Sequence, residues 1–203
     1  MLVLASTSPW RISMLKSGGV VAEGVAPPID EASVLAPEPV ALAEARALAK
    51  ARSVAVLRPA DWVIGADQVC WMEGQLFEKP KSPAEHLEHL RALRGRWHTL
   101  STAVALCMPG KERLHLEHTR ILLRSDLSDG ELAAYVAGGE GAACAGGYQA
   151  EAMGAQLIER VEGDWYNVIG LPLFALIGIL RSEGWRSPLN ASSTGVAEGT
   201  GSA

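Results

Sequence analysis

Charged side chains follow several predicted strands, at the positions where α/β sheets usually hold their sites. Asp67 comes directly after the apolar run WVIGA, Glu31 follows a Pro-Pro turn, and Lys79 lies in a Glu-Lys-Pro loop. A carboxylate at the end of a buried strand needs a partner or a metal ion, because burial of an isolated charge is unfavourable. Asp67 is therefore equally consistent with a structural ion pair and with a reactive group.

A polar cluster also surrounds a predicted helix start near the beginning of the chain. Ser6 and Ser8 follow an apolar run, Pro9 takes the first helical position, and Arg11 lies in the first turn. Serine caps and a proline at this position mark a helix N-terminus, whose free N–H groups suit an anion. Taken alone, helix capping and a surface arginine explain these residues better than a binding site does.

These groups form a recognisable chemical set together with Lys50, which lies on a predicted helix. Carboxylates bind Mg²⁺, which prefers oxygen ligands and phosphates. Cations and a helix N-terminus bind phosphate oxygens, and a remaining carboxylate can orient or deprotonate a water molecule. The residue types favour a site for a phosphorylated ligand and a metal ion, but composition alone does not bring the groups together.

Other motifs are absent or favour a structural interpretation. The Gly-Lys pair of the chain is followed by Glu112, so there is no phosphate-binding P-loop, and no G-x-S-x-G nucleophile motif occurs. His86 and His89 have a spacing that metal ligands on a helix can adopt. Neighbouring glutamates make a solvated, charged helix face the better explanation of both histidines.

The predicted elements alternate between strands and helices, separated by Gly, Pro and Ser turns. This order indicates an α/β domain around one curved, mixed sheet. Residues 187–203 lack periodicity and are rich in Gly, Ser and Ala, which predicts a disordered tail after a domain at 1–186. Strands are predicted at 2–6, 20–26, 62–67, 98–108, 114–124 and 156–161, a hairpin turn at 73–74, and helices at 9–16, 40–57, 82–94, 128–138 and after 172.

Length and composition bound the class of protein. The chain has 203 residues, of which 48% are hydrophobic and 20% charged, as in soluble single-domain proteins. Lys and Arg number 18 against 23 Asp and Glu, for a net charge of −5. This balance argues against a groove for a nucleic acid polymer, which depends on clustered cations. A small anionic ligand needs only a few well-placed cations.

Cysteine usage and hydropathy favour a cytoplasmic protein. The three cysteines, Cys70, Cys107 and Cys144, are far apart and odd in number, which is typical of reduced thiols in a cytosolic protein. The N-terminal segment lacks the basic start of a signal peptide. The uncharged stretch 165–180 falls short of the roughly 18 to 20 apolar residues that cross a membrane. We therefore expect no association with a membrane.

Short segments along the chain carry a resemblance to a known family. They are LVLASTSPWR, PPIDE, LAKA, VIGADQV, EKP, LRGRWHTL, AGGYQ and VEGDWYNVIGLPL. In this order they resemble the Maf family of nucleoside triphosphate pyrophosphatases, over about residues 2 to 185. The resemblance implies an elongated Maf/ITPase-like α/β fold with a cleft between two lobes, commonly as a homodimer. It also implies hydrolysis of a nucleoside triphosphate to the monophosphate and diphosphate with a divalent cation, Mg²⁺ or Mn²⁺.

The resemblance further implies a role for each charged residue, matched position by position. Asp67, Glu31 and Lys79 would be catalytic, with Asp67 accepting the proton of the water that attacks the α-phosphorus. Asp67 and Glu31 would also hold the metal ion. The residues that would contact the phosphates are Ser6, Arg11, Lys50 and Lys79.

Three more positions, Trp10, Gln68 and Glu151, are similar to the branch of the family that acts on 7-methyl-GTP. N7-methylated guanine carries a positive charge that an indole face such as that of Trp10 attracts. Glu151 can accept hydrogen bonds from guanine N1–H and N2–H₂ together. We expect these three residues to bind the base, although packing and surface charge also explain Trp10 and Glu151.

Alternatives from other classes stay open. The segment Gly147-Tyr148-Gln149 also resembles broad-specificity members, and a preference for dTTP and UTP is a further alternative. A non-catalytic, nucleotide-sensing regulator of cell division could lose Asp67 or Lys79 at little cost, yet both are present. A module that reads a methylated RNA cap is disfavoured by the acidic net charge. The expected function is hydrolysis of modified or unwanted nucleotides.

Overall fold

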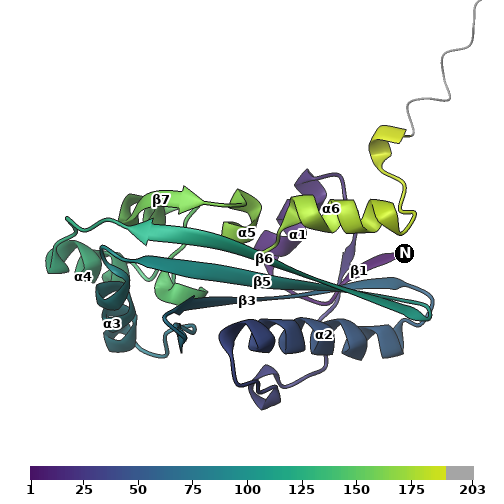
Figure 1. Ribbon diagram of the computed structural model, residues 1–203, viewed down its shortest axis with the longest axis horizontal. Helices are drawn as coiled ribbons and strands as arrows, with labels where there is room; N and C mark the ends of the chain where they lie inside the picture. The colour runs from purple at the N-terminus through teal and green to yellow at the C-terminus, as the bar shows by residue number, and fades with distance from the viewer. Residues whose placement is uncertain (191–203) are drawn as a thin grey trace, which may run out of the picture.

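A long mixed sheet runs through the molecule in the computed structural model, which describes residues 1–190 (Figure 1). Its seven strands lie in the order β2-β1-β3-β5-β6-β7, and β4 pairs with the end of β3. β1 pairs in parallel with β2 and β3, whereas the other pairs are antiparallel. The strands are β1 (Leu2–Leu4), β2 (Glu23–Gly24), β3 (Trp62–Met72), β4 (Gln75–Leu76), β5 (Trp97–Met108), β6 (Lys111–Leu123) and β7 (Ile158–Glu162).

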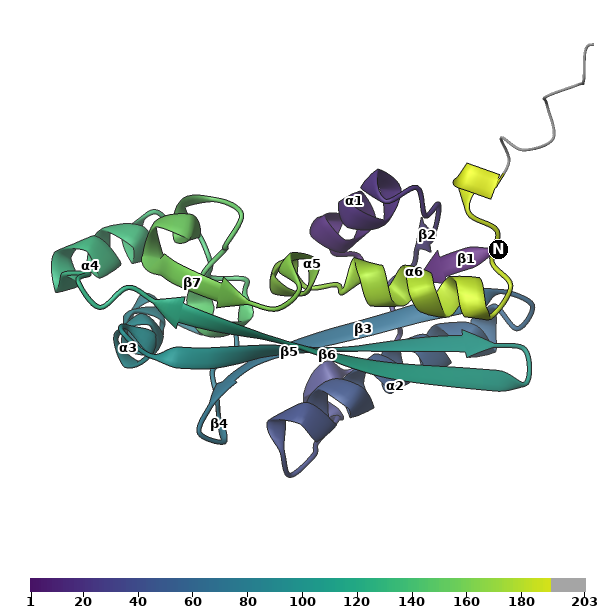
Figure 2. The ribbon, with the colours of Figure 1, turned by 45° about the horizontal axis from the view of Figure 1, so that its top comes forward.

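Helices cover the two ends of the sheet differently (Figures 1 and 2). The proximal lobe comprises the sheet end near β1, with α2 on one face and α1 and α6 on the other. The distal lobe comprises α3, α4 and β7 with the strand ends beside them. The short helix α5 lies between the two on the α6 side. The helices are α1 (Pro9–Ser17), α2 (Pro39–Leu57), α3 (Pro83–Leu93), α4 (Asp129–Ala137), α5 (Trp165–Ile169) and α6 (Leu173–Ser182).

Buried apolar side chains of the described residues form clusters that match these lobes. One cluster, which includes Phe77, Leu90 and Ile121, fills the distal lobe. In the proximal lobe, a second cluster lies between the sheet and α6, and a third lies under α2. Because β3 and β5 supply side chains to clusters in both lobes, the sheet connects them directly.

Serine caps and prolines set the starts of three helices. Ser8, Ser82 and Ser128 each accept a hydrogen bond from a backbone N–H in the first turn of α1, α3 and α4, respectively. Proline takes the next position at α1 and α3, where a missing N–H has no cost. At α4, Glu131 completes a capping box with Ser128. These local signals explain why the predicted helix starts agree with the structure.

Helix α2 lies unusually close to the centre of β3. A Cβ atom at Gly65 would lie 2.3 Å from the carbonyl oxygen of Ala47 and 2.7 Å from the amide nitrogen of Ala51. The facing side of α2 is built from small residues, with Ala43, Ala47 and Ala51 fully buried. Glycine and alanine therefore let the helix backbone approach the strand. This close approach brings Lys50 of α2 into contact with Asp67 of β3.

The predicted fold class, an elongated α/β fold with a mixed sheet flanked by helices, is confirmed. Strand β3 continues to Met72, well beyond the predicted end, whereas β2 contains only two of the residues predicted at 20–26. The sequence pattern does not predict α5. The prediction of a solvated face for His86 is wrong: the side chain is 2% exposed, because α3 packs it against the segment that contains Gly147.

Two further expectations concern the end of the chain and the membrane. Residues 187–190 form a turn in which the Asn190 N–H donates to the carbonyl oxygen of Ser187, while residues 191–203 of the predicted tail lie outside the described residues. None of the helices within residues 1–190 combines the length and the apolar character that crossing a membrane requires.

The close approach of α2 and β3 predicts that Gly65→Ala destabilises the protein strongly. The added methyl group meets helix backbone rather than a movable side chain, so we expect a loss on the order of 3 kcal/mol in the free energy of unfolding. Urea unfolding measures it. The control is Gly178→Ala inside α6, where an added Cβ meets nothing within 4 Å. This substitution should raise the free energy of unfolding by about 0.5–1 kcal/mol. Equal stability of Gly65→Ala and wild type would contradict this packing.

Candidate functional site

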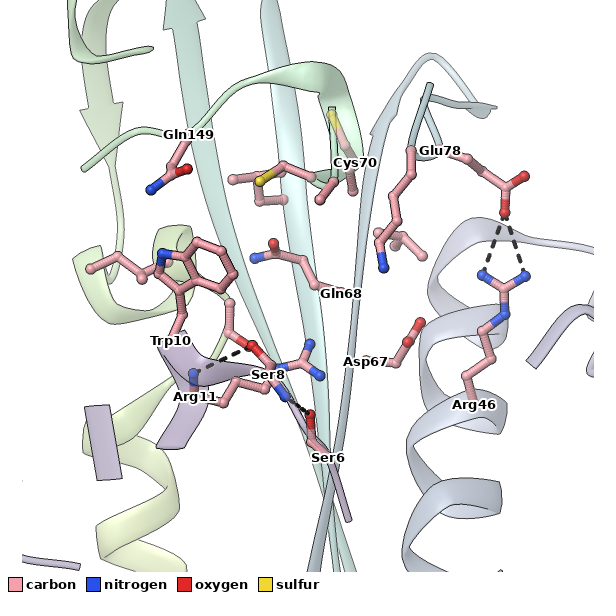
Figure 3. Close-up of a pocket in the computed structure, with 18 of the residues that line it drawn as sticks. Ser6, Ser8, Trp10, Arg11, Arg46, Asp67, Gln68, Cys70, Glu78 and Gln149 are labelled. Carbon is pink, nitrogen blue, oxygen red and sulfur yellow. Dashed lines mark hydrogen bonds and ion pairs between the residues drawn. The ribbon is translucent and has the colours of Figure 1, made fainter. Parts of the chain in front are cut away.

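A cavity of about 600 Å³ opens where the two lobes meet (Figure 3). The proximal lobe contributes the segment 5–11, part of α2 and the centre of β3, and the distal side contributes the segments 76–79 and 143–151. All the residues predicted for the site line this cavity: Ser6, Trp10, Arg11, Glu31, Lys50, Asp67, Gln68, Lys79 and Glu151. The structure thus brings together residues that are as far apart in the sequence as Ser6 and Glu151.

Lys50 joins the two predicted catalytic carboxylates. Its Nζ lies 2.6 Å from Oδ1 of Asp67 and 2.7 Å from Oε2 of Glu31. Lys50 and Asp67 are both buried, whereas half of the Glu31 side chain is exposed. Burial of either charge alone would be unfavourable, and the short, charge-assisted hydrogen bonds offset that cost. The result is a cation held between two carboxylates at the bottom of the cavity.

Neighbouring cations favour the ionised form of Glu31. Burial by itself raises the pKa of its carboxyl group, but the hydrogen bond from Lys50 and the charges of Lys50, Lys79 and Arg11 together lower the pKa below its usual value. Lys79 makes this contribution from an exposed position at the rim of the cavity. Glu31 therefore presents a negative charge that Lys50, Lys79 and Arg11 stabilise.

One oxygen of Asp67 is left free for a ligand. Oδ1 accepts the hydrogen bond from Lys50, while Oδ2 is buried and has no hydrogen-bond partner among the described residues. Buried carboxylate oxygens are normally satisfied. An unsatisfied one beside a cavity is a position where a water molecule, a metal ion or a bound ligand would compensate the missing partner.

Backbone carbonyls hold Arg11 at the start of α1. Its Nε donates to the carbonyl oxygen of Gly170 and its Nη1 to that of Ala66, both at 2.9 Å. Burial lowers the pKa of this guanidinium group, and the charges of Asp67 and Glu31 oppose the shift. Beside it, the Ser8 N–H donates to Oγ of Ser6. Arg11 and the α1 N-terminus together form a positively polarised wall.

The opposite part of the cavity contains an indole ring and two amide side chains. Figure 3 shows Trp10 and Gln149 on the side away from Asp67, and Gln68 lies between that side and Asp67. Nε2 of Gln68 donates to the carbonyl oxygen of Asn167 at 2.6 Å and to Oγ1 of Thr102 at 3.1 Å. Both amide hydrogens are thus used within the protein, and the oxygen Oε1 remains as an acceptor. Glu151, which also lines the cavity, is exposed.

Two buried histidines, neither predicted to belong to the site, support the glycine-rich segment at 143–151 that lines the cavity. The Nε2 atom of His86 is hydrogen-bonded to the carbonyl oxygen of Gly147, whose positive φ of 79° favours glycine. Tyr148 lines the cavity, and its hydroxyl lies 2.7 Å from Nε2 of the buried His98. Nothing in the local pattern reveals these histidines as supports, since each contacts a segment about fifty or more residues away.

Arg46 is another lining residue that the sequence prediction lacks. It precedes Lys50 by four residues on α2, so the two side chains leave the same face of the helix. Its guanidinium group is near Glu78 (Figure 3). The helical spacing from Lys50 is the signal that could have found it.

The acidic residues offer a limited site for a metal ion. No group of three or more His, Cys, Asp or Glu side chains within residues 1–190 is arranged to hold one. Asp67 and Glu31 nevertheless fit Mg²⁺, which is usually bound by one or two carboxylates together with substrate phosphates and water. The unsatisfied Oδ2 of Asp67 is consistent with such a ligand.

Comparison with known proteins gives a consistent result. The profile of the family described as "Maf-like protein" matches residues 1–183. A dTTP/UTP pyrophosphatase of Thermus thermophilus is 40% identical, covering 91% of this chain and 96% of that protein. A nucleoside triphosphate pyrophosphatase of Nitrobacter hamburgensis is 38% identical (90% and 94% covered), and a 7-methyl-GTP pyrophosphatase of Rhizobium etli is 36% identical (90% and 96% covered).

The buried His98 predicts a specific dependence of stability on pH. Burial lowers the pKa of His98 to about 4, from 6.5. As the pH falls, the unfolded chain takes up a proton at His98 before the folded chain does. The contribution of His98 to the free energy of unfolding should therefore be complete above pH 6.5, and about 3 kcal/mol of it should be lost as the pH falls to 4. We expect His98→Gln to flatten the unfolding free energy over this range, measured by urea unfolding at several pH values.

Tyr148→Phe is the matched control, because it removes the hydrogen bond to His98 but leaves the imidazole buried. This variant should keep the wild-type slope. An identical slope for His98→Gln and wild type would mean that His98 does not control acid stability.

Proposed function

Because this chain belongs to the Maf-like protein family, we propose that it hydrolyses a nucleoside triphosphate to the monophosphate and pyrophosphate in the cavity between its lobes. The observation that carries the proposal is the buried Lys50, which holds Asp67 and Glu31 beside a positively polarised wall. The names of the relatives agree in reaction type, since each is a nucleotide pyrophosphatase.

Cations of the site would bind the phosphate chain and stabilise the leaving group. Arg11, the N-terminus of α1 and Lys79 all line the cavity together with Asp67. As the bond to the α-phosphorus breaks, negative charge grows on the pyrophosphate oxygen. Fixed cations that face this oxygen lower the barrier without having to reorganise.

Asp67 would act on the attacking water molecule. Lys50 holds Oδ1, so Oδ2 is the oxygen available to accept a hydrogen bond from water. The water oxygen forms a bond to the α-phosphorus, the bond between that phosphorus and the α–β bridging oxygen breaks, and Asp67 takes the proton. The hydrogen bond from Lys50 to Oδ1 would limit the rotation of the carboxylate and leave Oδ2 for the water molecule.

A divalent metal ion, Mg²⁺ or Mn²⁺, is part of this proposal. Glu31 and Asp67 are the residues that would hold it, together with oxygens of the substrate. When bound, such an ion would neutralise phosphate charge. The exposed half of Glu31 gives the incoming complex of metal and nucleotide direct access to its carboxylate.

The structure favours two substrate classes for different reasons. Trp10, which is 42% exposed at the cavity, can stack on the cationic ring of 7-methyl-GTP, and Glu151 can accept hydrogen bonds from its N–H groups. The acceptor Oε1 of Gln68 instead suits the single N3–H of thymine or uracil as well as a purine N–H. We propose 7-methyl-GTP as the first candidate and dTTP or UTP as the second.

We predict that Asp67→Asn abolishes turnover but not binding. The amide keeps an oxygen for Lys50 but cannot take up a proton, so pyrophosphate release should fall on the order of 10²–10⁴-fold, with the nucleotide affinity changed by only a few fold. Asp126→Asn, which alters an exposed carboxylate paired with Arg124, is the control and should be fully active. Retained activity in Asp67→Asn would refute the assigned role.

Base recognition is tested with 7-methyl-GTP, GTP, dTTP and UTP in a pyrophosphate-release assay. Trp10→Leu should reduce kcat/KM for 7-methyl-GTP by roughly 2- to 30-fold and leave dTTP nearly unchanged, because only the methylated base is cationic. Trp165→Leu alters an equally exposed tryptophan outside the cavity and should change neither. Equal rates for all four nucleotides would remove the role of Trp10 and leave the reaction type intact.

A further inference from the structure

Arg46 is a cation of the cavity without a complete set of partners. Its side chain is 17% exposed and lines the cavity one helical turn before Lys50. Nothing within residues 1–190 accepts a hydrogen bond from its buried Nε. Buried donors of this kind are usually paired. The guanidinium group is therefore placed at the cavity with unused capacity to donate.

The bonds that Arg46 makes are weak compared with those of a neighbouring arginine. Its Nη1 and Nη2 both lie 3.4 Å from the same oxygen of Glu78, and half of the Glu78 side chain is exposed. In contrast, Arg52 on the same helix binds both oxygens of Glu112, at 2.8 and 2.6 Å. A long ion pair to one oxygen at a partly exposed position contributes little to stability, so a better acceptor could replace Glu78.

Arg46 lies at the end of the cavity where the phosphate chain would extend. Figure 3 shows Arg46 and Glu78 on the Asp67 side, across the cavity from Trp10 and Gln149. A nucleotide whose base lies near Trp10 and whose α-phosphorus lies near Asp67 would direct its outer phosphates away from Trp10. Arg46 is the next cation along α2 beyond Lys50 in this direction.

We infer that Arg46 binds the terminal phosphate of the substrate by exchanging the carboxylate of Glu78 for phosphate oxygens. A guanidinium group offers parallel donors that match two oxygens of a phosphate. This inference rests on the proposed function and adds a specificity residue to it. Arg46 would select nucleotides that carry the outer phosphates and would hold pyrophosphate after cleavage, with no contact to the nucleoside monophosphate.

The test is calorimetric binding of inorganic pyrophosphate and of UMP and GMP, each with Mg²⁺, to wild type and to Arg46→Met. We expect the variant to bind pyrophosphate on the order of tenfold more weakly, the loss of one charge-assisted interaction, and to bind the monophosphates as wild type does. Arg46→Lys keeps the charge but not the paired donors of the guanidinium group, so its affinity for pyrophosphate should lie between those of wild type and Arg46→Met. The control Arg52→Met removes an exposed pair outside the cavity and should change nothing.

Kinetics with the best nucleotide of the panel gives a second readout. Arg46→Met should raise KM and the inhibition constant of pyrophosphate by similar factors. The unfolding temperature of this variant should equal that of wild type. Equal weakening of pyrophosphate and monophosphate binding, or no weakening of either, would overturn the role of Arg46. A wild type that binds pyrophosphate through Arg46 but releases none from any nucleotide would overturn the proposed function alone.

Discussion

The ammonium group of Lys50 is the centre of the site, since it lies between two carboxylates and is almost shielded from solvent. Burial of the Asp67 or the Lys50 charge without a partner would be unfavourable, and the ion pair between them offsets that cost. Their contact depends on the backbone-to-backbone packing of α2 on β3 at Gly65, two residues before Asp67. Loss of that close packing would separate the ion pair and leave a buried charge without compensation.

A continuous sheet and a divided core together create the cavity. Strands β3, β5 and β6 extend through both lobes, whereas the helices and the apolar clusters are grouped at its two ends. Between these groups the side chains of β3 change from core residues to Asp67 and Gln68. The distal lobe closes the space with the glycine-rich segment 143–151, which His86 and His98 hold in place through Gly147 and Tyr148.

The two ends of the cavity differ in their chemistry. Near Asp67 the lining is charged, since Lys50, Arg11 and Arg46 line the cavity together with the carboxylates of Asp67 and Glu78. Beyond Trp10 it presents the indole ring and the amides of Gln68 and Gln149. A ligand that has an aromatic ring at one end and several negative charges at the other matches this distribution, which is the composition of a nucleotide with a phosphate chain.

Local interactions allowed the sequence to predict most helix boundaries, because serine caps, prolines and glycines act within a few residues, as at Ser8 and Ser128. The residue types and the family resemblance also identified several of the side chains that line the cavity, among them Arg11, Lys50 and Asp67. Tertiary structure alone revealed the bridging position of Lys50, the burial of His86 and the weak pairing of Arg46. These features depend on contacts between segments distant in sequence, and neither hydrophobic periodicity nor turn chemistry reports on such contacts.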